Sequence, residues 1–116
     1  MSTLCGTPLQ EGCEDGIHNQ AKFNSPCGLG LDINSNCLYV TDANHVVRKV
    51  SLSGEVRVST LCGIAGEYGN RDGLNPTFKF PKGIVVDSCS GSLYVMDSSN
   101  NKVRKIFLQN AENYIF

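Results

Sequence analysis

The residues Asp42, His45 and Arg48 lie in one short stretch and could carry chemistry together. A carboxylate and an imidazole are common parts of a general base or a metal site, and an arginine can bind an anion. A second copy of the stretch keeps the acid and the arginine as Asp97 and Arg104 but has no histidine. A residue that recurs with a repeat usually serves the repeated structure, so we interpret both acids as acceptors for turn amides. For His45 we favour a structural or surface role over catalysis.

Other catalytic motifs are not found in the sequence. No Gly-x-Ser-x-Gly elbow surrounds any serine, which leaves nucleophilic hydrolysis without support. The stretches GLGLDI and GIAGEYG lack the further residues of phosphate-binding loops, so their glycines are interpreted as loop or strand positions. Asp32 and Asp87 end two strand-like segments and are also interpreted as turn residues. We therefore expect no catalytic residue, no cofactor and no metal ligand.

Length and composition indicate one globular domain without a strong charge. The chain has 116 residues, 41% of them hydrophobic and 18% charged, with a formal net charge of -1. No apolar run approaches membrane-spanning length, and the first thirty residues do not resemble a signal peptide. The six cysteines could form a disulfide framework or stay free, and the lack of a signal peptide favours free thiols. We expect a cytoplasmic protein, with the nucleus as the alternative, and no membrane partner.

The chain contains an internal repeat. LYVTDANHVVRKV at 38–50 returns as LYVMDSSNNKVRKI at 93–106, and STLCG at 2–6 returns at 59–63. One residue is inserted before the repeated Arg-Lys pair, which moves its spacing from 55 to 56. The pairs separated by 55 residues are Pro26 and Pro81, Gly28 and Gly83, Asp32 and Asp87, and Tyr39 and Tyr94. A repeat of this length is typical of a fold built from stacked units.

Each repeat reads as short strands separated by turn residues. In the first copy, strands are predicted at 27–32, 37–41, 46–52 and 55–62. Strand residues alternate between two faces, so each Arg-Lys pair points in two directions, and we interpret these pairs as solvated strand charges. A helical period is suggested only in the final NAENYIF. The sequence therefore predicts an all-β fold.

The order of these segments resembles the NHL repeat. The pattern F-x-x-P-x-G, followed by LYV-x-D, an Asn-containing turn, V-R-K and STLCG, covers nearly the whole chain. DANHVVRK at 42–49 is similar to the histidine-containing segment of that family, whereas Cys5 and Cys62 stand where the family usually has alanine. The resemblance implies a β-propeller of four-stranded antiparallel blades, commonly six to a ring.

On this interpretation residues 1–116 are one propeller segment with two blades. Residues 2–6 are expected to be an edge strand, 23–63 the first blade, 78–108 three strands of the second blade, and 109–116 a tail. Two blades cannot close a ring. Two alternatives remain open: a homotrimer whose chains close a six-bladed ring by exchanging the edge strand, or a fragment of a longer propeller.

In such a blade, the loops before the first strand and between the second and third strands share one face. We expect a non-enzymatic module that binds a protein partner through this loop face, which mixes positive charge, amides and an aromatic ring with acids. Single-stranded RNA binding on the same face is the alternative, and a propeller enzyme of the amidating-lyase type is a second one. The resemblance also leaves a calcium ion in the ring channel conceivable. The expected loop-face residues are His18, Lys22, Asn44, His45, Tyr68, Arg71, Lys79, Asn100, Asn101 and Lys102.

Overall fold

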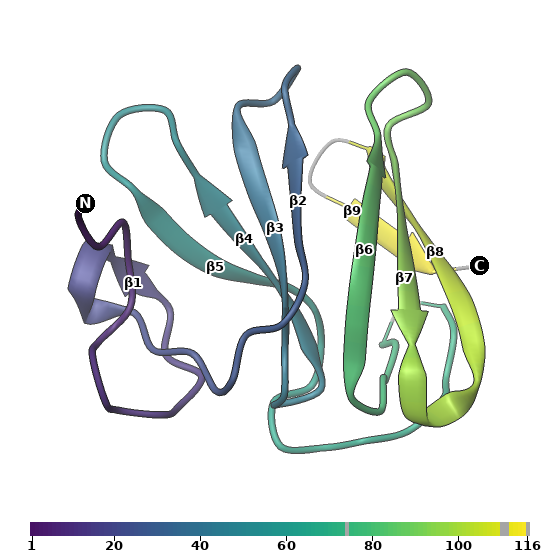
Figure 1. Ribbon diagram of the computed structural model, residues 1–116. Coiled ribbons are helices and arrows are strands. Elements are labelled where there is room, and N and C mark those ends of the chain that lie inside the picture. The colour runs from purple at the N-terminus through teal and green to yellow at the C-terminus, as the bar shows by residue number, and fades with distance from the viewer. Residues whose placement is uncertain (74, 110–111, 116) are drawn as a thin grey trace.

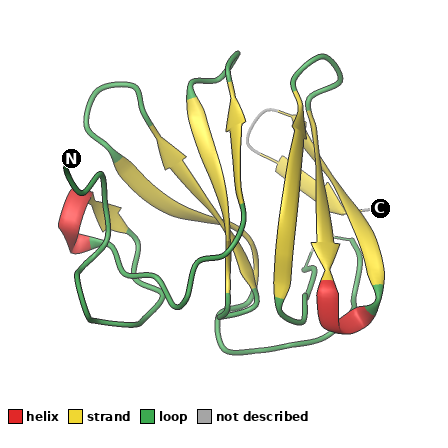
Figure 2. Cartoon of the chain, viewed as in Figure 1, coloured by secondary structure: helices red, strands yellow, loops and turns green. Residues whose placement is uncertain are grey.

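The alternating segments of the sequence fold as antiparallel strands in a computed structural model that describes residues 1–73, 75–109 and 112–115, and the all-β prediction is confirmed (Figure 1). Two sheets stand side by side, and two short 3-10 turns, η1 (His18–Gln20) and η2 (Ser98–Asn100), complete the regular elements (Figure 2). The first sheet has the order β1-β5-β4-β3-β2, with β1 (Gly16–Ile17), β2 (Leu29–Asp32), β3 (Cys37–Asp42), β4 (Val46–Ser51) and β5 (Arg57–Gly63). The second has the order β6-β7-β8-β9, with β6 (Pro81–Asp87), β7 (Ser92–Asp97), β8 (Lys102–Gln109) and β9 (Glu112–Ile115).

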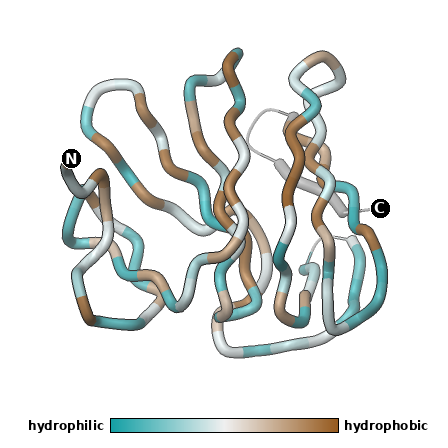
Figure 3. Tube along the Cα trace, in the orientation of Figure 1, coloured by the Kyte–Doolittle hydropathy of each residue, from teal (hydrophilic) through white to brown (hydrophobic). Residues whose placement is uncertain are grey.

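The main hydrophobic core lies between the two sheets. Alternation along β3 turns Cys37 and Tyr39 toward the second sheet, which contributes Leu93 and Val95 of β7. Phe78, from the loop before β6, is fully buried in the same cluster. Hydrophobic segments alternate with paler ones along the strands of both sheets (Figure 3). The two repeats are therefore held together by apolar side chains from both.

The N-terminal segment covers the other face of the first sheet. Val40, Val50 and Val58 form a second core there, and Cys5 and Phe23 pack against it. Residues 2–6 were expected to be an edge strand, but they form no strand in the structure. Cys5 of this segment packs half-buried against the apolar face instead, and β1 pairs with β5 at the edge of the sheet.

The C-terminal part differs from its prediction too. Residues 109–116 were expected to be a tail with a hint of helix, but β8 extends to Gln109 and β9 pairs with it. Residues 110, 111 and 116 lie outside the described part of the chain. The pairing of Phe107 with Tyr114 continues the antiparallel register, so β-forming residues prevail over a weak helical pattern.

Arg48 and Arg104 correct the prediction of solvated strand charges, because both side chains are almost fully buried. The Arg104 Nη1 donates to Thr77 O and Asp97 Oδ2 at 2.9 and 2.8 Å. Its Nε donates to Asp72 Oδ1 at 3.0 Å, and its guanidinium lies over the Phe78 ring at 5.1 Å. The loop before β6 therefore closes over the arginine and removes it from water.

The first repeat builds the same network with its own residues. The Arg48 guanidinium donates to Lys22 O and to Asp15 Oδ1, and it lies 5.0 Å from the centre of the Phe23 ring. Its Nη1 is 3.5 Å from the buried carboxylate of Asp42. Each of these partners is the sequence equivalent of a partner of Arg104. The repeat therefore reproduces a buried arginine that fixes the loop in front of its sheet.

The predicted role of the repeated acids is confirmed. Asp42 accepts hydrogen bonds from the amides of Asn24 and Asn44 at 3.0 and 2.8 Å. Asp97 accepts one from the Lys79 amide at 2.8 Å. Asp32 accepts from the amides of the turn that follows it. These carboxylates are therefore already engaged in holding turns and loops.

Candidate functional site

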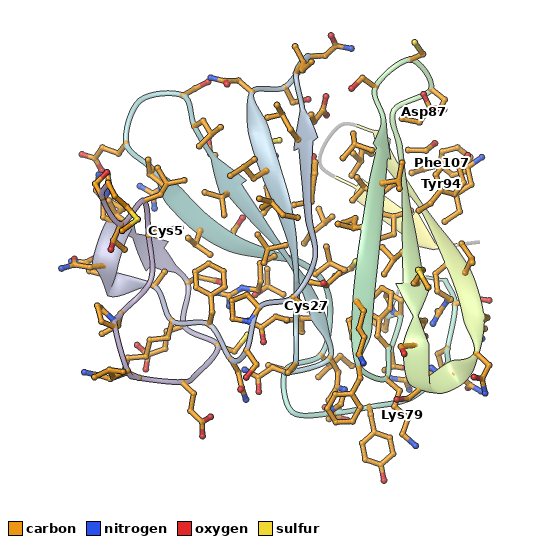
Figure 4. The ribbon with its side chains drawn as sticks, in the orientation of Figure 1. Cys5, Cys27, Lys79, Asp87, Tyr94 and Phe107 are labelled. Atoms are coloured by element: carbon orange, nitrogen blue, oxygen red, sulfur yellow. The ribbon has the colours of Figure 1, made fainter. Side chains whose placement is uncertain are left out.

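The loops expected to share one face do meet at one end of the molecule. The β3–β4 turn, the β7–β8 turn and the long loop before β6 lie at the lower end in Figure 1. Asn44 donates to Gly12 O at 3.0 Å, and its equivalent Asn100 donates to Gly69 O at 2.6 Å. Each turn is thus tied to the loop that precedes its own sheet. Lys79 lies at this end and Asp87 at the opposite one (Figure 4).

Three of the predicted residues come together here with one that the prediction lacked. The Tyr68 ring is 5.7 Å from the His45 ring, and the Lys79 ammonium is 4.9 Å from the centre of the Tyr68 ring. Phe80 adds an edge-to-face contact with His45 at 4.5 Å. We name Tyr68, Lys79 and Phe80, with His45 beneath them, the aromatic–lysine patch.

Four predicted residues border this patch. The Lys102 ammonium donates to Asn70 O at 3.1 Å, next to Arg71, whose side chain is exposed. Asn100 holds Gly69, as described above, and also donates to Asp97 at 2.7 Å. Asn101 has a positive φ of 55°, which asparagine adopts more readily than most residues. The amides of these turns therefore serve the local structure, while Arg71 is available to a partner.

Of the remaining predicted residues, Asn44 directly precedes His45 and accepts a hydrogen bond from the Gly66 amide at 3.1 Å, whereas Lys22 and His18 have partners in the first repeat. Lys22 is 3.5 Å from Glu14 in the loop before the first sheet, and Asn44 holds that loop through Gly12. His18 was placed on the loop face, but its amide donates to Val56 O in the β4–β5 turn, at the other end of the sheet. The prediction for His18 is wrong because β1 carries the chain along the outer edge of β5 before it returns.

His45 is held neutral by its surroundings. Its Nδ1 accepts a hydrogen bond from the Phe80 amide at 3.0 Å, so a neutral ring carries its proton on Nε2. Burial lowers the pKa of His45 below its ordinary value of 6.5; the charge of Asp97 opposes this shift and that of Lys79 adds to it. Protonation of His45 therefore costs more in the folded chain than in the unfolded one.

We expect this shift to make the chain less stable in mild acid. A lowered folded pKa means that the unfolded state binds more protons, so the contribution of His45 is complete above pH 6.5 and declines as the pH falls toward the folded pKa. The urea midpoint should fall more between pH 7.5 and pH 5 in the wild type than in His45→Asn, which carries the residue of the equivalent position 101. Equal falls in both proteins would contradict the role of His45.

The described residues show neither a cluster of metal ligands nor, at Cys62, a thiol with a lowered pKa. Within residues 1–73, 75–109 and 112–115, no three His, Cys, Asp or Glu side chains gather as metal ligands. All six cysteines are free, and burial raises the pKa of Cys62 to about 12. The thiol of Cys62 therefore stays protonated at neutral pH. None of the helices described is long and apolar enough to cross a membrane.

Phe80 is the residue of this site that the sequence prediction missed. It is 44% exposed and has a φ of 51°, whereas the equivalent position in the first repeat is Ser25 with a φ of 45°. Alignment of the two copies residue by residue could have identified it, because a large aromatic side chain stands where its repeat has a small polar one.

Comparison with known proteins agrees with this architecture. Residues 78–106 match the family model of the NHL repeat. The chain is 30% identical over 103 residues to the protein SUPPRESSOR OF QUENCHING 1 of Arabidopsis thaliana, a match that covers 84% of the chain. It is 41% identical over 63 residues, 53% of the chain, to human NHL repeat-containing protein 2.

A solved structure has the same fold. A protein of unknown function from Bacteroides thetaiotaomicron superposes on 97% of the chain with a TM-score of 0.79 and 26% sequence identity. The match takes up 26% of that protein, and the chain spans only 10% and 8% of the length of the plant and human relatives. In the present chain, the family model matches β6, β7 and most of β8, which belong to the second sheet. The chain therefore contains an NHL repeat over residues 78–106.

Proposed function

We propose that the chain is a non-enzymatic interaction module that binds a protein partner through the loop end around the aromatic–lysine patch. The observation that carries this proposal is the exposure of large side chains at a place the fold holds rigidly. Tyr68 is 65% exposed and Phe80 44%, while the loop beneath them is fixed by the buried Arg104. Aromatic residues on a rigid support are the usual anchors of protein interfaces.

The arrangement of these side chains favours a protein over an RNA as the binding partner. Lys22 pairs with Glu14 in the first repeat, apart from Lys79 and Lys102 in the second, whereas single-stranded RNA is usually bound along a continuous cationic groove. The rings of His45 and Phe80 meet at 71°, so they form no parallel slot for a base. RNA binding is therefore the alternative outcome of the test below.

The groups that could act as catalysts have other partners. Asp42 and Asp97 accept hydrogen bonds from loop amides and pair with the buried arginines. His45 uses Nδ1 to accept from the Phe80 amide. These contacts support a binding role without chemistry of its own. The free thiols suit the expected cytoplasmic location.

We also propose that both sheets act as blades of a propeller, flanked by further blades. Met96 and Val103 on the outer face of the second sheet are 57% and 67% exposed. Their equivalents in the first sheet, Thr41 and Val47, are buried against the second sheet. On the opposite side, Leu29 borders an apolar pocket of about 340 Å³. One outer face thus exposes apolar side chains and the other has an apolar pocket, as expected for head-to-tail stacking of repeats.

The source of the flanking blades has two alternatives, a homotrimer or a longer chain. A trimer that exchanges residues 2–6 needs an open edge on the second sheet, and β9 lies at that edge. Residues 2–6 in turn contribute Cys5 to the face of their own first sheet. These contacts favour flanking blades from a longer chain over strand exchange.

Site-specific photocrosslinking tests the proposed surface. A photoreactive residue at Arg71, beside the patch, should crosslink to a protein in cell extract. The same residue at Glu55, in the exposed β4–β5 turn at the opposite end, serves as the matched control. Crosslinks to protein from position 71 only are the expected result. Crosslinks to RNA at 71, or equal protein yields at both positions, would contradict the proposal.

A further inference from the structure

Three residues of the aromatic–lysine patch come from the second repeat and one, His45, from the first. The three from the second repeat, Tyr68, Lys79 and Phe80, correspond to Glu11, Asn24 and Ser25 in the first repeat. The frames of the two loops are the same, since Gly12 and Gly69 accept equivalent hydrogen bonds from the asparagines of their turns. The fold is therefore built with polar residues in one copy, and it does not require aromatic rings at these positions.

The backbone at Phe80 supports a role beyond folding. Phe80 and Ser25 both have positive φ values, 51° and 45°, so the loop imposes this conformation on either side chain. A bulky residue is unfavourable there, and glycine or a small polar residue is the usual occupant. Phe80 packs against His45 but keeps 44% of its surface exposed, so burial accounts for only part of the ring. A strained, exposed aromatic residue of this kind points to a binding site.

The charges around the patch have a small positive excess. Lys79 belongs to the patch, and Lys102 and Arg71 lie on the adjoining loop and turn. The guanidinium of Arg104 is shared by the two acids Asp72 and Asp97. Glu67, next to Tyr68, is exposed. In this described part of the chain, four cations (Arg71, Lys79, Lys102 and Arg104) therefore stand against three acids (Glu67, Asp72 and Asp97), which leaves an excess of one positive charge. A partner with negative charge would therefore be attracted to this surface.

We propose that the aromatic–lysine patch binds an acidic peptide segment of the partner. An apolar side chain of the peptide packs on Phe80 and the free side of Tyr68, and a neighbouring carboxylate meets the Lys79 ammonium. Because Lys79 already lies over the Tyr68 ring, the carboxylate and the ring can share it, as in interfaces that combine an aromatic anchor with a charge pair. This inference rests on the proposed function and names the partner's chemistry.

Fluorescence anisotropy with two labelled twelve-residue peptides tests the inference. One alternates glutamate with leucine and phenylalanine, and the other has lysine in place of each glutamate. The wild type should bind the acidic peptide at least about tenfold more tightly than the basic one, and the preference should shrink at 300 mM salt. Equal affinity for the two peptides would overturn the inference, and so would tighter binding of a twelve-residue oligouridine.

Variants that carry the residues of the first repeat locate the binding. Phe80→Ser and Lys79→Asn should each weaken the acidic peptide by about tenfold. Phe80→Ser should also keep its melting temperature, because the loop tolerates serine at position 25. Ile33→Ser, at an exposed turn residue of the opposite end, is the matched control and should bind as the wild type does. Unchanged binding by Phe80→Ser would overturn the inference. If position 71 still crosslinks to a protein, only the partner's chemistry is wrong and the proposed function stands.

Discussion

Replacing Arg104 with methionine should destabilise the chain by about 3–5 kcal/mol. The guanidinium donates to Asp72, Thr77 O and Asp97, and the carboxylate of Asp97 is fully buried. Methionine fills a similar volume but leaves Asp97 charged and without its cation. The loop before β6 also loses the contacts that hold it over Phe78. The expected loss is therefore a large part of the stability of a small domain.

Urea unfolding followed by circular dichroism measures this loss. Arg57→Met is the matched control, since Arg57 lies in β5 with an exposed side chain and should change the free energy of unfolding by less than about 0.5 kcal/mol. A loss of less than about 1 kcal/mol for Arg104→Met would show that the buried arginine does not hold the loop. The surface formed by Tyr68 and Lys79 would then lack its support.

Replacing Gly28 with alanine should cost about 3 kcal/mol or more, because the first sheet has no room for a methyl group there. A Cβ at this position would lie 2.0 Å from Lys82 O and 2.8 Å from the Thr41 hydroxyl. The carbonyl belongs to β6, so the second sheet would have to move away as a unit. This movement would open the core that contains Phe78 and Leu93.

Gly83→Ala is the matched control for Gly28, since the two glycines are equivalent in the repeat. A Cβ at Gly83 would meet the Met96 sulfur at 3.0 Å, and this flexible side chain can move. We expect a change of less than about 1 kcal/mol in the same urea experiment. If Gly28→Ala is as mild as Gly83→Ala, the sheets do not pack as closely as described. Where a further blade covers the second sheet, Gly83 should become as sensitive as Gly28.

Much of the fold could be predicted from the sequence because both copies of the repeat show the same order of strand segments and turn residues. The segments at 37–41 and 46–52 lie within one residue of β3 and β4. The acids at the strand ends bind turn amides as their spacing indicates. Local alternation and turn chemistry determine these features, and both can be read from neighbouring residues.

The failures share a physical cause, which is contact between distant segments. Alternation shows that Arg48 and Lys49 point to opposite faces, but not that the loop with Asp15 closes over one of them. His18 was misplaced because the path of the chain before β2 depends on the pairing of β1 with β5. Residues 2–6 repeat a strand sequence, yet here they cover an apolar face. Burial of that face outweighs the local pattern.

The sequence predicted the placement of some residues of the candidate site. The loops that meet, and the presence of His45, Tyr68 and Lys79 on them, follow from strand order. The role of Asn44 and Asn100 as loop anchors does not, because it depends on hydrogen bonds to Gly12 and Gly69. Phe80 was missed because its exposure and its φ of 51° are properties of the folded loop.

The most direct test of the account is the crosslinking yield from position 71 in a chain whose patch has been replaced by that of the first repeat. The triple variant Tyr68→Glu, Lys79→Asn and Phe80→Ser carries the residues of positions 11, 24 and 25. It should keep the unfolding free energy of the wild type within about 1 kcal/mol, because the buried arginine network is untouched. Crosslinking to the protein partner should fall to the yield of position 55. A folded triple variant that crosslinks as well as the wild type would contradict the claim that these unrepeated residues form the binding surface.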